Sequence, residues 1–453
     1  MKRITGIMAS GLVLALASGP ASAGSPVGEF SANMTATSDY VWRGVSQTME
    51  DPAIQGGIDW SHDSGLYAGV WASNVDFGDA ADIEMDLYGG FTGEAGGFSY
   101  DIGYIYYSYP DDQNGINFSE VYTSVGRDFG IASVTAGLAY GFGYAGGVGK
   151  SWYPTLDIEV PLGNTGLSAA GHIGYYSFTN DSDYTEWSLG LTMPFKGLDL
   201  SLSWHDTDIS GDDQADSRLV FAISRSLDSA SRDDKTGGMF PGEFSASLDL
   251  TSDYVWRGVS QTMEGPAIQA SLDWSHDSGL YVGLWATNVD FGRPGEKASL
   301  EIDYYGGYSG EINGIGYDIG YNYYSYPSDQ SNSNFGEFYA SLSHDIGPAS
   351  ATVGVYWGNN NPGGVGDSWY PYLDIEAPIP LNGPVGLSVA GHIARYSFNN
   401  SADYTEWSLG VTASVFSIDM TVAWHDTDLS RADLGGNNDV ANGRVVFTLG
   451  TGF

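Results

Sequence analysis

The residues Asp-Ile-Glu-Met-Asp-Leu-Tyr at positions 82–88 alternate between a charged face, which ends on a tyrosine, and an apolar face. Because successive side chains of a β-strand point to opposite sides, Glu84 and Asp86 share one face, and Met85 and Leu87 share the other. Runs with this period recur roughly twelve times in each half of the chain, and the first of them covers residues 29–42. The sequence therefore predicts an all-β fold.

The connections between these runs are sorted by length. Short turns such as residues 61–65 and 195–197 follow every second run, whereas longer polar stretches such as residues 46–52 and 206–215 follow the others. Short turns at one end and long loops at the other are typical of outer-membrane β-barrels. A soluble sandwich gives no reason for this sorting, so we predict a transmembrane antiparallel β-barrel.

The residue types on the two faces of the runs are those expected of a barrel wall with lipid on one side and water on the other. The charged face also carries small residues, while the apolar face carries Trp and Tyr, as expected for aromatic girdles at both membrane interfaces. The chain ends in an alternating run that finishes on Phe453, which is typical of barrels delivered to the outer-membrane insertion machinery. We expect outer-membrane lipid and this machinery, through the C-terminal Phe453 strand, as partners.

The chain carries one unit twice. The block Thr-Ser-Asp-Tyr-Val-Trp-Arg-Gly-Val-Ser-Gln-Thr at residues 37–48 recurs unchanged at residues 251–262. A polar stretch without periodicity separates the two copies, as in a linker. We predict a first β-barrel repeat at residues 24–227, a polar periplasmic linker at residues 228–242 and a second β-barrel repeat at residues 243–453.

About twelve strands per copy fit two architectures, namely two tandem barrels or one barrel of about 24 strands. Two barrels are favoured because the connection between the copies, residues 226–242, is far longer than the other turns expected at that end. A merged barrel needs only another tight turn there.

Residues 1–23 have the features of a cleaved signal peptide. Lys2 and Arg3 precede an apolar stretch, and the small residues Ala21 and Ala23 fit a cleavage site. We therefore expect export of the chain and localisation in the outer membrane of a Gram-negative cell.

The composition argues against several other classes. The 453 residues carry a formal net charge of -40, from 16 basic and 56 acidic side chains, so nucleic acid is not expected as a partner. The chain has no cysteine, which excludes disulfides and thiol nucleophiles. Residues 206–211 weakly resemble the start of a calcium loop but lack its closing Glu, and no nucleophile elbow is visible. We expect no metal, no cofactor, no catalytic residue and no enzymatic activity.

The repeated block, following a signal peptide, resembles the TorF-type porins, also known as the Gcw_chp outer-membrane proteins. The resemblance covers nearly all of the mature chain. It implies an outer-membrane barrel and names no substrate. The duplication departs from the ordinary single-copy pattern and leaves the number and size of the pores open.

The phase of the predicted strands places a set of charged and histidine side chains on the face away from lipid. These candidates for the lumen are Asp39, Arg43, Glu84, Asp86, Asp101, Glu120, Asp157, Glu159, His172, Glu186, His205 and Arg218 in the first copy, and Asp253, Arg257, Glu301, Asp303, Asp318, Glu337, Asp374, Glu376, His392, Glu406, His425 and Arg444 in the second.

Two interpretations of this set stay open. Its members either line a pore that selects solutes, or they form a salt-bridge network that plugs or braces the barrel, with Arg43 and Arg218 neutralising carboxylates. Twelve strands lie between filled small barrels and open porins, so the strand number does not decide.

The excess of acids over Arg on the lumen face predicts a porin-like channel for passive diffusion of small hydrophilic solutes, with a preference for cations. The alternative is a non-enzymatic structural or adhesive β protein of the outer membrane or the medium, whose acidity reflects solubility or a saline habitat.

Overall fold

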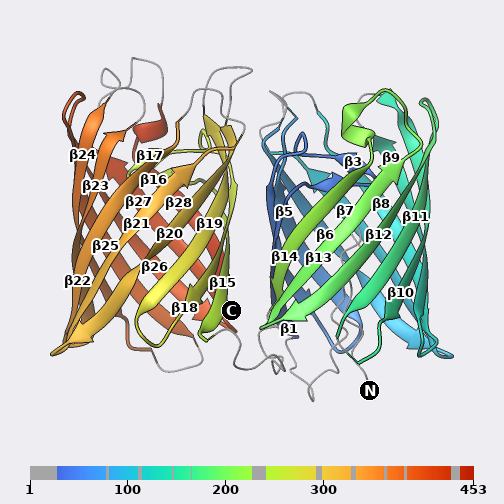
Figure 1. The fold of residues 1–453 in the computed structure, drawn as a ribbon, viewed down its shortest axis with the longest axis horizontal. Helices are drawn as coiled ribbons and strands as arrows, with labels where there is room; N and C mark the ends of the chain where they lie inside the picture. The colour runs from blue at the N-terminus through green and yellow to red at the C-terminus, as the bar shows by residue number, and fades with distance from the viewer. Residues whose placement is uncertain are drawn as a thin grey trace. The chain divides into compact units, whose positions relative to one another are not determined.

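The computed structural model describes residues 28–77, 81–110, 115–144, 147–164, 166–226, 241–291, 298–327, 333–361, 365–381, 385–429 and 439–453. The predicted signal peptide and nearly all of the predicted linker lie outside these residues. The chain divides into two compact units, Met1–Gly237 and Gly238–Phe453. Each unit contains one closed antiparallel barrel (Figure 1).

The first barrel has a wall of twelve strands that pair in chain order. They are β1 (Glu29–Thr37), β4 (Ala53–Ser61), β5 (Leu66–Asn74), β6 (Ile83–Ala95), β7 (Phe98–Ser108), β8 (Phe118–Asp128), β9 (Ser133–Tyr144), β10 (Gly149–Pro161), β11 (Ser168–Phe178), β12 (Tyr184–Phe195), β13 (Leu198–Thr207) and β14 (Arg218–Ser226). Two further short strands, β2 (Val41–Trp42) and β3 (Val45–Ser46), pair only with each other. The 3-10 helix η2 (Asp213–Ala215) precedes the last strand.

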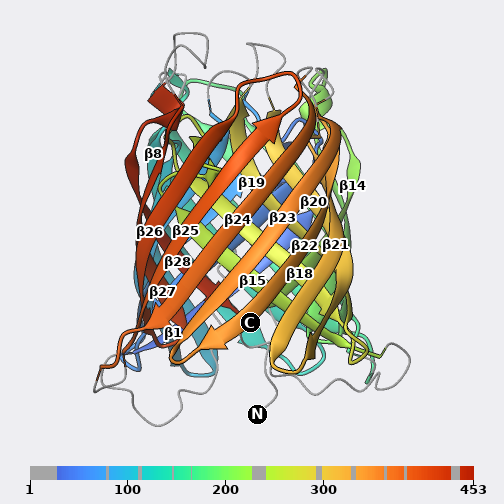
Figure 2. The same cartoon turned by 90° about the vertical axis from the view of Figure 1, so that its left-hand side faces the viewer.

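The second barrel repeats this plan, and Figure 2 shows the tilt of its strands. Its wall consists of β15 (Glu243–Thr251), β18 (Ala267–Ser275), β19 (Leu280–Phe291), β20 (Ala298–Ile312), β21 (Ile315–Ser325), β22 (Phe335–Ile346), β23 (Ala349–Asn361), β24 (Gly366–Pro378), β25 (Gly386–Phe398), β26 (Tyr404–Val415), β27 (Ile418–Thr427) and β28 (Arg444–Gly452). Its short pair is β16 (Val255–Trp256) and β17 (Val259–Ser260), and its 3-10 helix is η4 (Asp439–Ala441).

The prediction of two twelve-stranded barrels is confirmed, and a single barrel of about 24 strands is wrong. The reason lies in how each copy closes. Strand β1 pairs with β14, with Asn33 opposite Ser226, and β15 pairs with β28, with Ser247 opposite Gly452. Each first strand is therefore paired on both sides, and no free edge remains for a merger. Within the described residues, no helix is long and apolar enough to cross a membrane.

The connections within each barrel set its two ends apart. We call the end with residues 62–65 and 196–197 the turn end, and the end with residues 109–117 and 208–217 the loop end. The connection between β9 and β10 is short although it lies at the loop end, because both strands run on until only residues 145–148 separate them.

The strand β12 shows how the faces are used. Leu189 points outward and is 62% exposed, whereas Glu186, three residues earlier on the inward face, is 0% exposed. The same holds for Ile102 on β7, which is 58% exposed, and Glu120 on β8, which is 1% exposed. An apolar outer surface around buried charges inverts the arrangement of a soluble protein and suits a wall surrounded by lipid.

We expect Leu189→Arg to lower the free energy of unfolding in lipid vesicles by about 2–4 kcal/mol, because an Arg at the middle of a lipid-facing strand meets hydrocarbon. Urea titration of the protein folded into vesicles measures this free energy of unfolding. The control is Ile131→Arg in the turn between β8 and β9, where the side chain is 80% exposed and the cost falls to about 0–1 kcal/mol. Equal small effects at both sites would contradict a lipid-facing β12.

Candidate functional site

Residues 38–52 leave the barrel wall at the loop end and fold into the lumen as the β2–β3 hairpin. Gln47 N donates to Tyr40 O at 2.7 Å, and the rings of Tyr40 and Trp42 are buried. We call residues 38–52 and their counterparts 252–266 the lumen hairpins. The predicted first run over residues 29–42 is therefore wrong in its second part, because the wall strand ends at Thr37, and the polar stretch at residues 46–52 belongs to the hairpin.

This placement corrects the position of four predicted lumen residues. Asp39, Arg43, Asp253 and Arg257 lie on the lumen hairpins and not on wall strands, since β1 ends at Thr37 and β15 at Thr251. The apolar side chains of the repeated block satisfy a strand pattern, but they are buried by packing inside the barrel.

The tip of the first hairpin requires glycine. Arg43 and Gly44 have φ angles of 48° and 84°. A Cβ on Gly44 would lie 2.5 Å from Thr207 Cγ2 and 2.7 Å from Glu186 Cβ. Only glycine tolerates both this backbone conformation and this approach to β12 and β13.

Asp39 anchors the hairpin to the last wall strand. Its Oδ1 accepts hydrogen bonds from Ser46 Oγ at 2.7 Å and Thr48 Oγ1 at 3.0 Å, which close the hairpin on itself. Its Oδ2 accepts from Arg218 Nη1 of β14 at 3.0 Å. The carboxylate thus joins the hairpin fold to the barrel wall.

Arg43 anchors the hairpin to the opposite part of the wall. Its two Nη atoms donate to the two carboxylate oxygens of Glu120 at 2.9 and 2.6 Å. The guanidinium lies 4.3, 4.1 and 4.5 Å from the ring centroids of Trp42, Tyr153 and Tyr176. A bidentate ion pair enclosed by aromatic faces is a strong and specific contact in a dry site.

The second barrel repeats both anchors. Arg257 donates through both Nη atoms to Glu337, with Nη1 2.9 Å from Oε1, and Arg444 Nη1 lies 2.8 Å from Asp253 Oδ2. The arginines of both copies thus neutralise carboxylates, and each hairpin is fixed at two points.

The hairpin divides the first lumen into a packed half and a wet half. Toward the loop end, inward side chains such as Glu84, Asp86 and Tyr107 are at most 2% exposed. Toward the turn end, Asp157 and Glu159 are partly exposed. Water therefore reaches the acidic inward positions from the turn end.

A histidine network braces the wall below the hairpin. His172 Nδ1 lies 2.6 Å from Asp157 Oδ1, and its Nε2 lies 2.5 Å from Glu186 Oε1. Tyr153 O–H donates to the same Glu186 oxygen. In the second copy His392 bridges Asp374 and Glu406 in the same way.

The remaining predicted lumen residues are distributed along the wall. Several carboxylates accept a neighbouring donor: Glu84 from Tyr40 O–H at 3.2 Å, Asp101 from Tyr67 O–H at 2.8 Å, Glu301 from Tyr254 O–H at 3.2 Å and Asp318 from Tyr281 O–H at 2.6 Å. His205 Nε2 lies 2.7 Å from Ser203 Oγ, His425 occupies the same register opposite Arg444, and Glu376 is exposed on β24. Across the described ranges, no group of three or more His, Cys, Asp or Glu could hold a metal ion.

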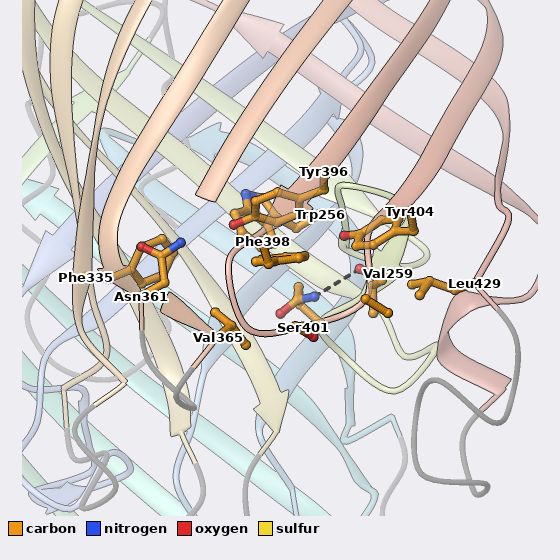
Figure 3. Close-up of a pocket in the computed structure, with 12 residues that line it drawn as sticks. Trp256, Val259, Phe335, Asn361, Val365, Tyr396, Phe398, Ser401, Tyr404 and Leu429 are labelled. Atoms are coloured by element: carbon orange, nitrogen blue, oxygen red, sulfur yellow. Dashed lines mark hydrogen bonds between the residues drawn. The ribbon is translucent and has the colours of Figure 1, made fainter. Parts of the chain in front are cut away.

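A pocket of ≈ 320 Å³ lies at the loop end of the second barrel (Figure 3). Aromatic side chains from the lumen hairpin and from three wall strands form its walls, namely Trp256, Phe335, Tyr396, Phe398 and Tyr404. One rim is the connection that contains Ser401, where Asp403 accepts a hydrogen bond from the Phe398 N–H that lowers the pKa of its carboxyl. We call this the mouth pocket.

Sequence reasoning missed the inward fold of the hairpins. One signal was available. In the repeated block, Tyr40, Val41 and Trp42 are apolar on both faces, which does not suit a wall between lipid and water, and Gly44 follows directly. A segment that is apolar on both faces and ends at a glycine turn indicates burial inside the barrel.

A family model described as "Bacterial protein of unknown function (Gcw_chp)" matches residues 20–226 and again residues 235–453. No curated protein sequence matches the chain.

A search of solved structures matches the chain to a number of proteins, of which we give three. A KdgM porin is 10% identical, with a TM-score of 0.32, and the match covers 43% of this chain and 98% of that one. Pseudomonas aeruginosa OccK7 (OpdD) is 12% identical, with a TM-score of 0.30 and coverage of 94% and 98%. The P pilus usher (PapC) translocation pore is 8% identical, with a TM-score of 0.36 and coverage of 94% and 99%. At these TM-scores the similarities carry no argument about this chain.

We expect Arg43→Met to destabilise the first barrel by about 3–5 kcal/mol, because it leaves the buried Glu120 carboxylate without its partner. The double variant with Glu120→Gln should recover much of this loss. Unfolding titrations in lipid vesicles measure both.

The matched control is Arg395→Met, which removes an ion pair with Asp403 in which the arginine side chain is 54% exposed. Such a pair contributes about 0–1 kcal/mol. If Arg43→Met cost no more than the control, the lumen hairpin would not depend on its ion pair.

Proposed function

The chain belongs to the Gcw_chp family of bacterial proteins, and we propose that it is an outer-membrane channel through which small hydrophilic solutes diffuse passively, with a preference for cations. The narrower TorF-type resemblance remains a prediction. The proposal is supported by one combination of features: a closed barrel with an apolar outer face, and a lumen whose wet half carries carboxylates.

Several features support an outer-membrane location. The N-terminal 23 residues have the composition of a signal peptide, and the outward faces are apolar. Phe453 directly follows the closing strand β28, and it remains paired with the first strand: its N–H donates to Ala246 O at 2.8 Å and its O accepts from Ala246 N at 2.6 Å. We propose that the insertion machinery recognises this terminal strand, and that the turn ends face the periplasm.

The distribution of charge supports cation preference. Arginine side chains at the hairpins are neutralised by Glu120 and Asp39, and by their counterparts in the second copy. Nearer the turn end, Asp157 and Asp374 each contact a histidine, whereas Glu159 and Glu376 have no ion pair within the described residues and contribute negative charge to the wet half. Carboxylates along a pore raise the local concentration of cations and lower that of anions.

The lumen hairpin limits the size of a solute. It crosses the interior at the loop end and is fixed to two parts of the wall, so only small molecules or ions pass beside it. The same packing favours the second candidate, a structural or adhesive barrel without conductance. Electrical measurements separate the two functions.

We expect the protein in planar bilayers under a KCl gradient to show a reversal potential with the sign that indicates higher permeability to K⁺ than to Cl⁻. The variant Asp157→Asn, Glu159→Gln, Asp374→Asn, Glu376→Gln should reduce this potential by at least half, because it removes four acids that are accessible to water near the turn ends of the two lumens. Neutralising Asp212 and Asp213 in the exposed loop is the control and should matter little at 1 M salt, where the Debye length is about 3 Å.

Anion preference would contradict the cation-preferring channel. Absence of conductance from protein that is correctly folded, as shown by its heat-modifiable migration, would favour the structural barrel.

A further inference from the structure

The lumen of the second barrel contains a cavity of ≈ 380 Å³. Its walls come from strands β19 to β23 and consist of Tyr281, Trp285, Asp303, Tyr305, Asp318, Asn322, Tyr339 and Tyr356. The guanidinium of Arg257 lies 4.5 Å from the ring of Tyr396 in the mouth pocket and 5.2 Å from the ring of Tyr356 in this cavity. We call this the inner cavity, and the Arg257 side chain contacts the walls of both spaces.

Two hydrogen-bond acceptors at the inner cavity have no partner. Asp303 is 7% exposed, and its Oδ2 accepts from Asn322 Nδ2 at 3.1 Å. The other oxygen of Asp303, Oδ1, and the amide oxygen Oδ1 of Asn322 are buried without a hydrogen-bond partner in the described part of the chain. Leaving such groups unsatisfied is costly, and most of all for a carboxylate. A ligand that donates hydrogen bonds and carries positive charge would remove the cost.

The protein itself does not supply this charge. Arg257 donates through both Nη atoms to Glu337 and is thereby neutralised. Asp303 has no ion pair within the described ranges. Glu301, two residues before it on β20, accepts the O–H of Tyr254 and also shares a side-chain hydrogen bond with Asp303, which requires a proton on one of the two acids. An external cation can take the place of that proton and pair with Asp303.

The aromatic walls favour an organic cation over a bare metal ion. Tyr281 O–H donates to Asp318 at 2.6 Å, and Tyr305 O–H donates to Asp273. Because these two hydroxyls are engaged with the wall, a ligand meets mainly the aromatic rings of the lining. Aromatic rings attract ammonium groups through cation–π interaction.

The first barrel offers a natural comparison. Tyr339 is paired across the sheet with Tyr356, whereas the corresponding Tyr122 is paired with Ala139. Likewise Asn322 is opposite Glu337, whereas Ile105 is opposite Glu120. Both carboxylate oxygens of the matching Asp86 also lack a hydrogen-bond partner within the described residues, so the unpartnered acid is common to both copies. The second copy differs by one more aromatic ring and one more acceptor beside this acid.

We propose that the inner cavity of the second barrel binds a small organic ammonium ion that has at least one N–H group, held by Asp303 and Asn322 and enclosed by the rings of Trp285 and the tyrosines. The proposal deepens the channel function, because it names a class of solute, and it rests on that function for the route by which the ion reaches the lumen.

Isothermal titration calorimetry on the full mature chain in detergent tests the binding. Butylammonium chloride should bind with one site per chain. Tetramethylammonium, which is charged but has no N–H, should bind at least tenfold more weakly, and 1-butanol and KCl should give no saturable heat. Absence of saturable butylammonium binding, or equal binding of 1-butanol, would overturn the proposal.

Variants locate the site. Asp303→Asn should weaken butylammonium binding at least tenfold, whereas Asp86→Asn, the same change at the matching position of the first barrel, should leave it unchanged. The double variant Asn322→Ile, Tyr356→Ala installs the residues that the first barrel carries at these positions, so it is compatible with folding, and it should likewise weaken binding at least tenfold. An equal loss from Asp86→Asn would place the ion elsewhere and overturn the assignment.

The binding test does not require conductance. If the protein binds butylammonium but does not conduct, the proposed channel function is wrong and the proposed ammonium site stands. If the protein conducts but binds no butylammonium, the proposed site is wrong and the channel function stands.

Discussion

Backbone N–H and C=O groups find no water in the hydrocarbon of a membrane, so a sheet that crosses it must pair every strand on both sides. The first and last strands of each copy satisfy this condition by pairing with each other, β1 with β14 and β15 with β28. Closure also decides what each face meets. The outward side chains contact lipid, whereas the inward side chains contact one another, the hairpin or water. Charged side chains are therefore found on the inward face.

A ring of twelve strands encloses more space than its inward wall side chains fill at the loop end, and the hairpin occupies that space. Its aromatic rings contribute apolar contact, while Asp39 and Arg43 bind Arg218 and Glu120 on separate parts of the wall. Buried ion pairs gain little net stability over apolar packing, but they specify position, because any other position leaves a charge unpaired. The ion pairs thus fix the position of the hairpin, and its aromatic side chains fill the space between the hairpin and the wall.

Much of the wall could be predicted from local pattern. The alternation around Glu84 and Asp86 identifies their face, and the tight turns place most strand ends within a few residues of their positions in the structure. The hairpin could not be predicted in this way. Period-two alternation says which side of a strand a residue occupies, and it does not say where the backbone leaves the sheet. That depends on contacts distant in sequence, such as Arg43 with Glu120 and Gly44 with Glu186 and Thr207. The role of Asp303 was equally hidden, since only the structure shows which buried oxygen lacks a donor.

The position of the hairpin within the chain also links its anchoring to closure of the barrel. Residues 38–52 lie between the first two wall strands, and Arg43 reaches Glu120 of β8 in the middle of the wall, whereas the other anchor, Arg218, belongs to the last strand. That strand lies beside β1 only because the ring is closed. The doubly anchored hairpin is therefore a property of the closed barrel alone, and a chain without β14 could hold the hairpin only through Arg43.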